Sequence, residues 1–223
     1  MQEFGDLGLD LGHRSIRGLP YYDMSGLPGE RQLGVFDRLY RRGVDGGKVM
    51  VLEIGPADTL TPAETAAHLD RGLVLAVDIA SWAEMADEGS SFGTRKVNVG
   101  SLGRQMRDRD GVAAFFKIDA HALAADYQFD RVQLVFPTPA AEEIEPLVVQ
   151  AVNLVKPGGE LVVFYEDWGE AVSGKDLVTG LKRRGVAANL ELMTPARIKN
   201  EYGLTDSEFL SQERVKVIRV TRG

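Results

Sequence analysis

Short apolar runs alternate with helix-like stretches from residue 48 almost to the end of the chain. The runs are rich in β-branched residues and lie at 48–54, 73–79, 113–119, 131–137, 160–166, 187–193 and 214–220. Middle runs that are apolar on both faces predict strands covered by helices on each side. Their alternation with helices predicts an α/β fold: a doubly wound, mostly parallel, seven-stranded sheet. The last run alternates apolar with basic residues, which predicts a strand at the periphery of that sheet.

Capping signals and helical spacing place helices between these strands. The segment Thr61-Pro62-Ala63-Glu64 has a hydroxyl suited to capping, a proline for the first helical position and an acid in the first turn. A helix is therefore expected from about residue 62 to Gly72. Further helices are expected near 81–88, near 101–109, over 140–155, and over 175–184, where Gly185 closes the helix.

The segment before residue 48 has a different character. Its first 30 residues are rich in glycine and proline without periodicity, whereas residues 30–42 place Leu33, Phe36, Leu39 and Tyr40 on one helical face. We expect residues 1–47 to form an N-terminal arm and an amphipathic helix that packs on the core. Residues 48–223 are expected to form the Rossmann-like domain.

Composition narrows the class of protein. The 223 residues carry a net charge of −7 at a pI of about 5.1, so a dominant basic face for phosphate contacts is not expected. The absence of cysteine excludes a thiolate nucleophile or a zinc–thiolate site, and three scattered histidines disfavour any metal site. No apolar stretch is long enough for a membrane span and no signal peptide is evident, which predicts a cytoplasmic protein with no membrane partner.

Candidate chemistry gathers where the predicted strands end. Glu53 and Gly55 end the first run and open a loop that leads into the capped helix, while Asp78 ends the second run. A small-residue turn before a helix N-terminus lets ligand atoms approach backbone N–H groups. An acid about 20 residues further on suits ribose hydroxyls. The third run ends in Asp119 and the fourth leads into Phe136-Pro137-Thr138-Pro139, so all four signals fall on the carboxyl edge of the sheet.

With these motifs, residues 48–166 resemble the class I S-adenosylmethionine-dependent methyltransferase family. VLEIGPADT is similar to the family's first motif, LVLAVDI to the strand that ends in the ribose-binding acid, and NLVKPGGELVVFYED to its turn and fifth strand. KIDAHAL resembles the motif whose acid and small residue flank the adenine. The resemblance implies S-adenosyl-L-methionine as cofactor and a methyl acceptor as substrate.

The resemblance also implies site residues. Those for the cofactor are Glu53, Gly55, Pro56, Ala57, Thr59, Asp78, Ile79, Asp119, Ala120 and Phe136. Phe136 and Thr138 are candidates for the methyl-transfer region, and no universal catalytic residue or metal is expected. Two residues have open alternatives: Glu53 either touches the ligand or orients the loop from within the domain, and Asp119 either flanks the adenine or caps the short helix after it.

Departures from the family pattern motivate other hypotheses. Ala57 and Thr59 stand where the family usually has its second and third glycines, so a catalytically inactive, methyltransferase-like binding or regulatory domain is the alternative. An NAD-dependent enzyme is disfavoured because Gly55 stands without a full G-x-G-x-x-G. The Phe136–Pro139 segment is similar to the Phe-Pro-Asp-Pro of tRNA guanine-N7 methyltransferases, but the acidic AAEEIE that follows opposes phosphate contacts. A small-molecule acceptor is favoured over nucleic acid.

Overall fold

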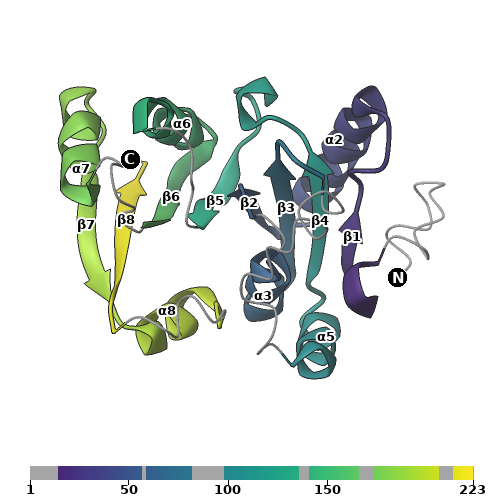
Figure 1. Ribbon diagram of the computed structural model, residues 1–223. Helices are drawn as coiled ribbons and strands as arrows, with labels where there is room; N and C mark the ends of the chain where they lie inside the picture. Colours follow the sequence, from purple (N-terminus) through teal and green to yellow (C-terminus); the bar gives the residue numbers. More distant parts are fainter. Residues whose placement is uncertain are drawn as a thin grey trace.

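The computed structural model describes residues 15–56, 59–81, 98–135, 141–165, 173–205 and 213–222. Within these residues, eight strands form one sheet in the order β1-β4-β3-β2-β5-β6-β8-β7 (Figure 1). The strands are β1 (Tyr21–Asp23), β2 (Val49–Ile54), β3 (Gly72–Asp78), β4 (Val112–Lys117), β5 (Phe129–Val135), β6 (Val155–Tyr165), β7 (Ala188–Met193) and β8 (Val215–Thr221). The doubly wound α/β prediction is confirmed, and each of the seven predicted runs overlaps a strand.

The prediction of seven strands is corrected by β1, which the N-terminal arm supplies. Tyr21 is completely buried and pairs with Ala113 of β4 in parallel register. A strand of three residues is too short to show alternation, so the sequence pattern held no signal for it. The arm thus extends the sheet beyond β4 at the edge.

The position of β8 also differs from expectation. It lies between β6 and β7 and runs antiparallel to both, with Ile218 opposite Val163 of β6 and Leu190 of β7. The outer strand on this side is therefore β7. Basic residues are tolerated within β8 because Arg219 forms ion pairs with acids of neighbouring elements, so the alternation did not signify a peripheral strand.

Helices cover both faces of the sheet (Figure 1). The α-helices are α2 (Gly29–Asp45), α3 (Thr61–His68), α5 (Val99–Asp108), α6 (Ala141–Asn153), α7 (Gly174–Arg183) and α8 (Pro195–Tyr202), with short 3₁₀ turns η1 (Ile16–Gly18) and η2 (Ala120–Ala122). The core against one face is built with α2, α6 and α7, and the cores against the other with α3, α5 and α8. None of the helices in the described ranges is long and apolar enough to cross a membrane.

Most helix predictions agree with the structure, with three differences. Helix α3 ends at His68, before the expected Gly72, because Gly72 is already the first residue of β3. In α2, Phe36 and Leu39 are buried as expected, but Leu33 is 41% exposed and lies outside the buried stripe. At α3, Leu60 occupies the N-cap position and the Thr61 hydroxyl does not cap the helix, because it turns instead to Glu53. The helix expected near 81–88 lies outside the described residues, apart from Ser81.

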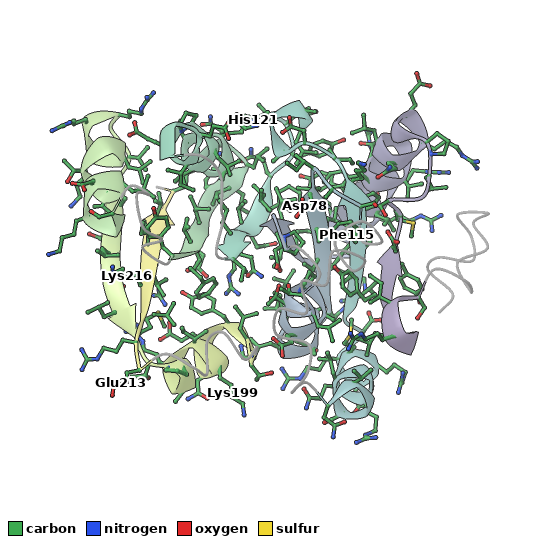
Figure 2. All side chains as sticks on the ribbon, viewed as in Figure 1. Asp78, Phe115, His121, Lys199, Glu213 and Lys216 are labelled. Carbon is green, nitrogen blue, oxygen red and sulfur yellow. The ribbon has the colours of Figure 1, made fainter. Side chains whose placement is uncertain are left out.

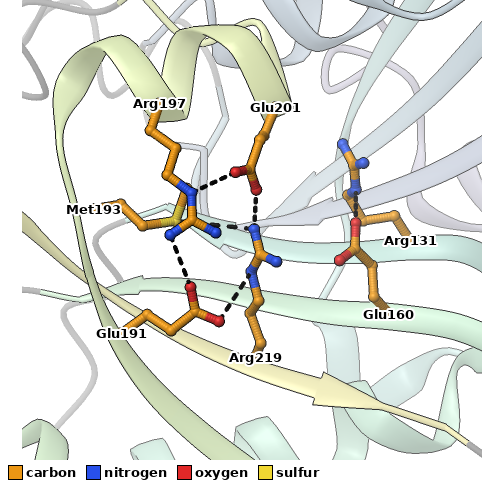
Figure 3. Close-up of polar contacts among 7 residues, drawn as sticks. All are labelled: Arg131, Glu160, Glu191, Met193, Arg197, Glu201 and Arg219. Carbon is orange, nitrogen blue, oxygen red and sulfur yellow. Dashed lines mark hydrogen bonds and ion pairs between the residues drawn. The ribbon is translucent and has the colours of Figure 1, made fainter.

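Helix α8, which the sequence pattern did not predict, is fixed to the sheet by paired charges (Figure 3). Arg197 and Glu201 of α8 pair with Glu191 of β7 and Arg219 of β8, respectively. The Tyr202 ring packs under the Arg219 and Arg131 guanidinium groups, whose carbons lie 5.4 and 4.9 Å from its centroid. These contacts hold α8 although it has only eight residues.

The chain reverses its winding direction next to β2. From β2 the chain adds β3 and then β4 on one side, and later returns to add β5 and β6 on the other side. In open α/β sheets, ligands bind at such a switch point, beyond the carboxyl ends of the strands. The loop after β2 therefore leaves the sheet where a ligand crevice is expected.

Candidate functional site

Gly55 begins the loop between β2 and α3 in a left-handed conformation. Its φ is 68°, a value that side chains with a β-carbon rarely adopt. Its N–H donates a hydrogen bond of 2.9 Å to the Val77 carbonyl of β3. A β-carbon built on Gly55 would meet no atom within 4 Å, so open space faces the residue. The side of Gly55 on which a β-carbon would stand is therefore open, while the approach of a ligand to this backbone stays a prediction.

Thr59 does not project into that space. Its side chain is 6% exposed, and its hydroxyl donates a 2.7 Å hydrogen bond to the Pro56 carbonyl. It also lies 2.7 Å from the Thr61 hydroxyl. The branched side chain at position 59 is therefore buried and hydrogen-bonded within the loop.

Glu53 is fully buried beneath the loop. One carboxylate oxygen accepts a hydrogen bond from Thr61, and the other accepts one of 2.7 Å from the Gln133 amide of β5. This arrangement matches the alternative in which Glu53 orients the loop from within the domain. A direct contact between Glu53 and a ligand stays a prediction.

Asp78, labelled in Figure 2, ends β3, the strand that pairs with β2 at the switch point. Its Oδ1 accepts a 3.1 Å hydrogen bond from the Ala80 N–H, which forms a tight turn after the strand. The next side chain, Ile79, is 76% exposed, a high value for a large aliphatic residue. An acid and an exposed apolar side chain therefore stand together at this edge, and their contacts with ribose and adenine stay predictions.

Asp119 follows β4 and caps η2. Its Oδ1 accepts a 2.9 Å hydrogen bond from the His121 N–H and lies 3.0 Å from the His121 Nδ1. The hydrogen bond from the His121 backbone holds the pKa of the Asp119 carboxyl below its usual value, so it stays ionised at neutral pH. The capping alternative is thus observed, while Ala120 is buried and the His121 ring is half exposed (Figure 2). Whether Asp119 also contacts adenine stays a prediction.

Three predicted site residues lie outside the described residues: Ala57, Phe136 and Thr138. The structure brings the others to the carboxyl ends of three neighbouring strands, β2, β3 and β4. Gly55 and Asp78 are joined most directly, through the hydrogen bond from Gly55 to the residue before Asp78.

Gln133 and Thr65 are polar residues of the site that the sequence analysis did not single out. Gln133 donates to Thr65 Oγ1 over 2.9 Å as well as to Glu53, and both residues are fully buried. The available signal was a glutamine inside the apolar run 131–137, because an amide in a buried strand requires hydrogen-bond partners.

Comparisons with known proteins support the fold. No protein-family model matches the sequence, and no curated protein matches it. Among solved structures, the chain is similar to the 16S rRNA methyltransferase KamB, with a TM-score of 0.54 at 14% identity over 85% of this chain and 93% of that one. It is also similar to the 16S rRNA (adenine(1408)-N(1))-methyltransferase from Catenulisporales acidiphilia, with a TM-score of 0.52 at 15% identity over 89% and 95% of the two chains.

A third similar structure is an O-methyltransferase family protein from Burkholderia thailandensis. The TM-score is 0.52 at 14% identity over 86% of this chain, which spans 56% of the length of that protein. At such identities the likeness concerns the fold. The chain has the fold of the class I S-adenosylmethionine-dependent methyltransferases.

Proposed function

We propose that this protein binds S-adenosylmethionine at the carboxyl edge of the sheet and transfers its methyl group to an acceptor. The observation that carries the proposal is the pairing of Gly55 with the end of β3. A left-handed glycine facing open space is hydrogen-bonded to Val77, directly before Asp78. This pairing lies at the switch point of a methyltransferase fold, where ligands of open α/β sheets bind.

The described residues suit separate parts of such a cofactor. In the proposal, the Asp78 carboxylate accepts hydrogen bonds from the ribose hydroxyls and Ile79 packs beside the adenine. Ile79 already exposes apolar surface that a flat ring would cover. Asp119 and Ala120 flank the adenine from the end of β4, where Asp119 is ionised and able to accept a hydrogen bond.

The loop from Gly55 to Thr59, including Pro56 and Ala57, would receive the methionine portion. Glu53 then acts from beneath the loop, because both of its carboxylate oxygens are already bonded to protein groups and its side chain is fully buried. We therefore assign Glu53 an indirect part in cofactor binding.

S-adenosylmethionine, when bound, supplies an activated methyl group on a sulfonium. The protein's contribution is then chiefly to align the acceptor with that methyl and, where the acceptor requires it, to remove a proton. We propose that Phe136 and Thr138, which follow β5, border the methyl-transfer region.

For the acceptor, we propose a small molecule. The net charge of −7 supplies no general attraction for a polyanion. The similar structures include two rRNA methyltransferases and an O-methyltransferase family protein, so the fold is compatible with either class of acceptor.

Calorimetric titration of the purified protein with S-adenosylmethionine and with S-adenosylhomocysteine tests the proposal. We expect both to bind in the micromolar range or tighter, with 1:1 stoichiometry. Absence of binding by either ligand at concentrations far above micromolar would contradict the proposal. Binding without methyl transfer to any member of a broad small-molecule or RNA panel would favour the inactive binding-domain alternative.

A further inference from the structure

A buried pair of side chains joins the two strands that flank the switch point. Glu53 of β2 and Gln133 of β5 are direct partners in the parallel register, and neither side chain is exposed. The Gln133 Nε2 donates to Glu53 Oε2 over 2.7 Å and to Thr65 Oγ1 of α3 over 2.9 Å. One amide group therefore links β5, β2 and α3.

The same network continues into the loop. Glu53 Oε1 accepts from the Thr61 hydroxyl, and the Thr61 N–H donates to Thr59 Oγ1 over 3.5 Å. The Thr59 hydroxyl in turn reaches the Pro56 carbonyl over 2.7 Å. A continuous chain of buried polar contacts thus runs from β5 to the loop that begins at Gly55.

The orientation of the Gln133 amide indicates that the network requires a hydrogen-bond donor at this position. Both Nε2 contacts are made, whereas Oε1 accepts no hydrogen bond from any residue in the described part of the chain. A buried acceptor without a donor raises the free energy of the folded state. The hydrogen-bonding of Oε1 alone would therefore favour the opposite amide orientation, in which Oε1 and Nε2 exchange places. The observed orientation instead gives a donor to the Glu53 carboxylate.

We propose that Gln133 is a positioning residue for S-adenosylmethionine, acting through Glu53 and Thr61 on the loop that receives the ligand's methionine portion. The inference rests on the proposed function. Without the amide, the buried Glu53 carboxylate loses the donor that Gln133 supplies to Oε2, and loss of this hydrogen bond in a buried network changes the preferred position of the carboxylate. Thr61 and the loop change position together with Glu53. Ligand affinity therefore falls, although Gln133 makes no contact with the ligand.

Gln133→Met provides the first test, with Arg131→Met as the matched control. Arg131 lies two residues earlier on β5 and pairs with Glu160 over 2.8 Å, outside the Glu53 network. Calorimetry with S-adenosylhomocysteine should show affinity at least ~10-fold lower for Gln133→Met and within about twofold of wild type for Arg131→Met. Wild-type affinity in Gln133→Met, or equal losses in both variants, would overturn the inference.

Gln133→Glu gives a readout that general destabilisation does not produce. Two carboxyl groups at this distance share a proton at low pH, and the shared proton replaces the donated hydrogen of the amide. At higher pH both groups ionise and repel each other. The affinity of Gln133→Glu relative to wild type should therefore fall as the pH rises from about 6 to about 9, and a ratio that stays flat would contradict the inference.

Hydrogen exchange of the ligand-free protein separates this inference from the proposed function. Peptides covering residues 59–65 should exchange faster in Gln133→Met than in wild type or Arg131→Met. If the wild type binds neither ligand, the proposed function fails and the positioning role fails with it. If the wild type binds and Gln133→Met changes neither exchange nor affinity, the inference alone fails.

Discussion

The Gly55 N–H donates a 2.9 Å hydrogen bond to the Val77 carbonyl, so the loop that leaves β2 stays attached to β3 one residue beyond the strand. Because Val77 directly precedes Asp78, this bond places a left-handed glycine beside the acid that is proposed to hold the ribose. Two motifs that are 23 residues apart in the chain become one site through a single backbone contact.

Asp78→Asn should weaken binding of S-adenosylhomocysteine by ~10- to 100-fold, because hydrogen bonds to a charged acceptor contribute about 1.5–3 kcal/mol. The asparagine oxygen can still accept from the Ala80 N–H, so the turn is retained. Calorimetry measures the affinity. Asp23→Asn is the control, because Asp23 ends β1 and makes a similar turn with Ser25, two strands away. Equal losses in both variants would contradict the ribose assignment.

Gly55→Ala should lower the free energy of unfolding by about 1–2 kcal/mol, the usual cost of a left-handed β-carbon. It should also weaken ligand binding, because the new methyl group enters the space that faces the loop. Gly185→Ala is a matched control, since Gly185 has a φ of 79° and equally open surroundings after α7. Urea denaturation should give similar losses of stability for both variants, with affinity reduced in Gly55→Ala alone.

Tyr202→Phe should leave stability at neutral pH unchanged within about 0.5 kcal/mol or raise it, because the buried hydroxyl makes no hydrogen bond within the described residues. Tyr202→Leu should cost about 2–4 kcal/mol, because the ring packs against Phe164 and under two guanidinium groups. Urea denaturation at pH 7 distinguishes these expectations, and a large loss in Tyr202→Phe would show that the hydroxyl is bonded.

Alkaline conditions should destabilise the protein partly through Tyr202. Burial raises the pKa of its phenol from 10.0 to about 12, so the folded state favours the neutral form. The unfolded chain ionises first, and stability is lost as the pH rises from about 10 to about 12, by up to ~3 kcal/mol. Denaturation curves of Tyr202→Phe should show a shallower decline than wild type over this range; parallel curves would contradict the assignment. Tyr21, whose pKa burial also raises, accounts for further decline in both proteins.

Asp110→Ala should destabilise the protein by about 1–2 kcal/mol. The Lys48 ammonium, on a side chain only 5% exposed, lies 3.0 Å from the Asp110 carboxylate and would lose that partner. Asp110→Asn should cost less, because asparagine tolerates the residue's φ of 53° and offers an acceptor in the same place. Thermal melting of the two variants checks the order, and equal melting temperatures would contradict the contribution of backbone strain and of the acceptor facing Lys48.

Local sequence signals were sufficient to predict much of the fold, because the burial of a strand is visible in the residues of that strand. Runs of β-branched residues must be covered on both faces, and this requirement alone predicted β2, β3, β4, β5 and β6 as strands between helices. Gly55 and Asp78 could be recognised as candidate site residues from the sequence. A turn glycine lets a ligand approach the backbone, and a strand-end acid at that spacing suits ribose hydroxyls.

The sequence by itself determined seven of the eight described strands, most helices and the edge at which the candidate chemistry gathers. Only the tertiary structure decided the insertion of β8 between β6 and β7, the addition of β1, and the pairing of Glu53 with Gln133, 80 residues apart. Strand order depends on how whole elements pack, and a buried hydrogen bond depends on which side chains face each other across a register. Neither is encoded in the periodicity of a single segment, so the network beneath the proposed cofactor loop became visible only in the folded chain.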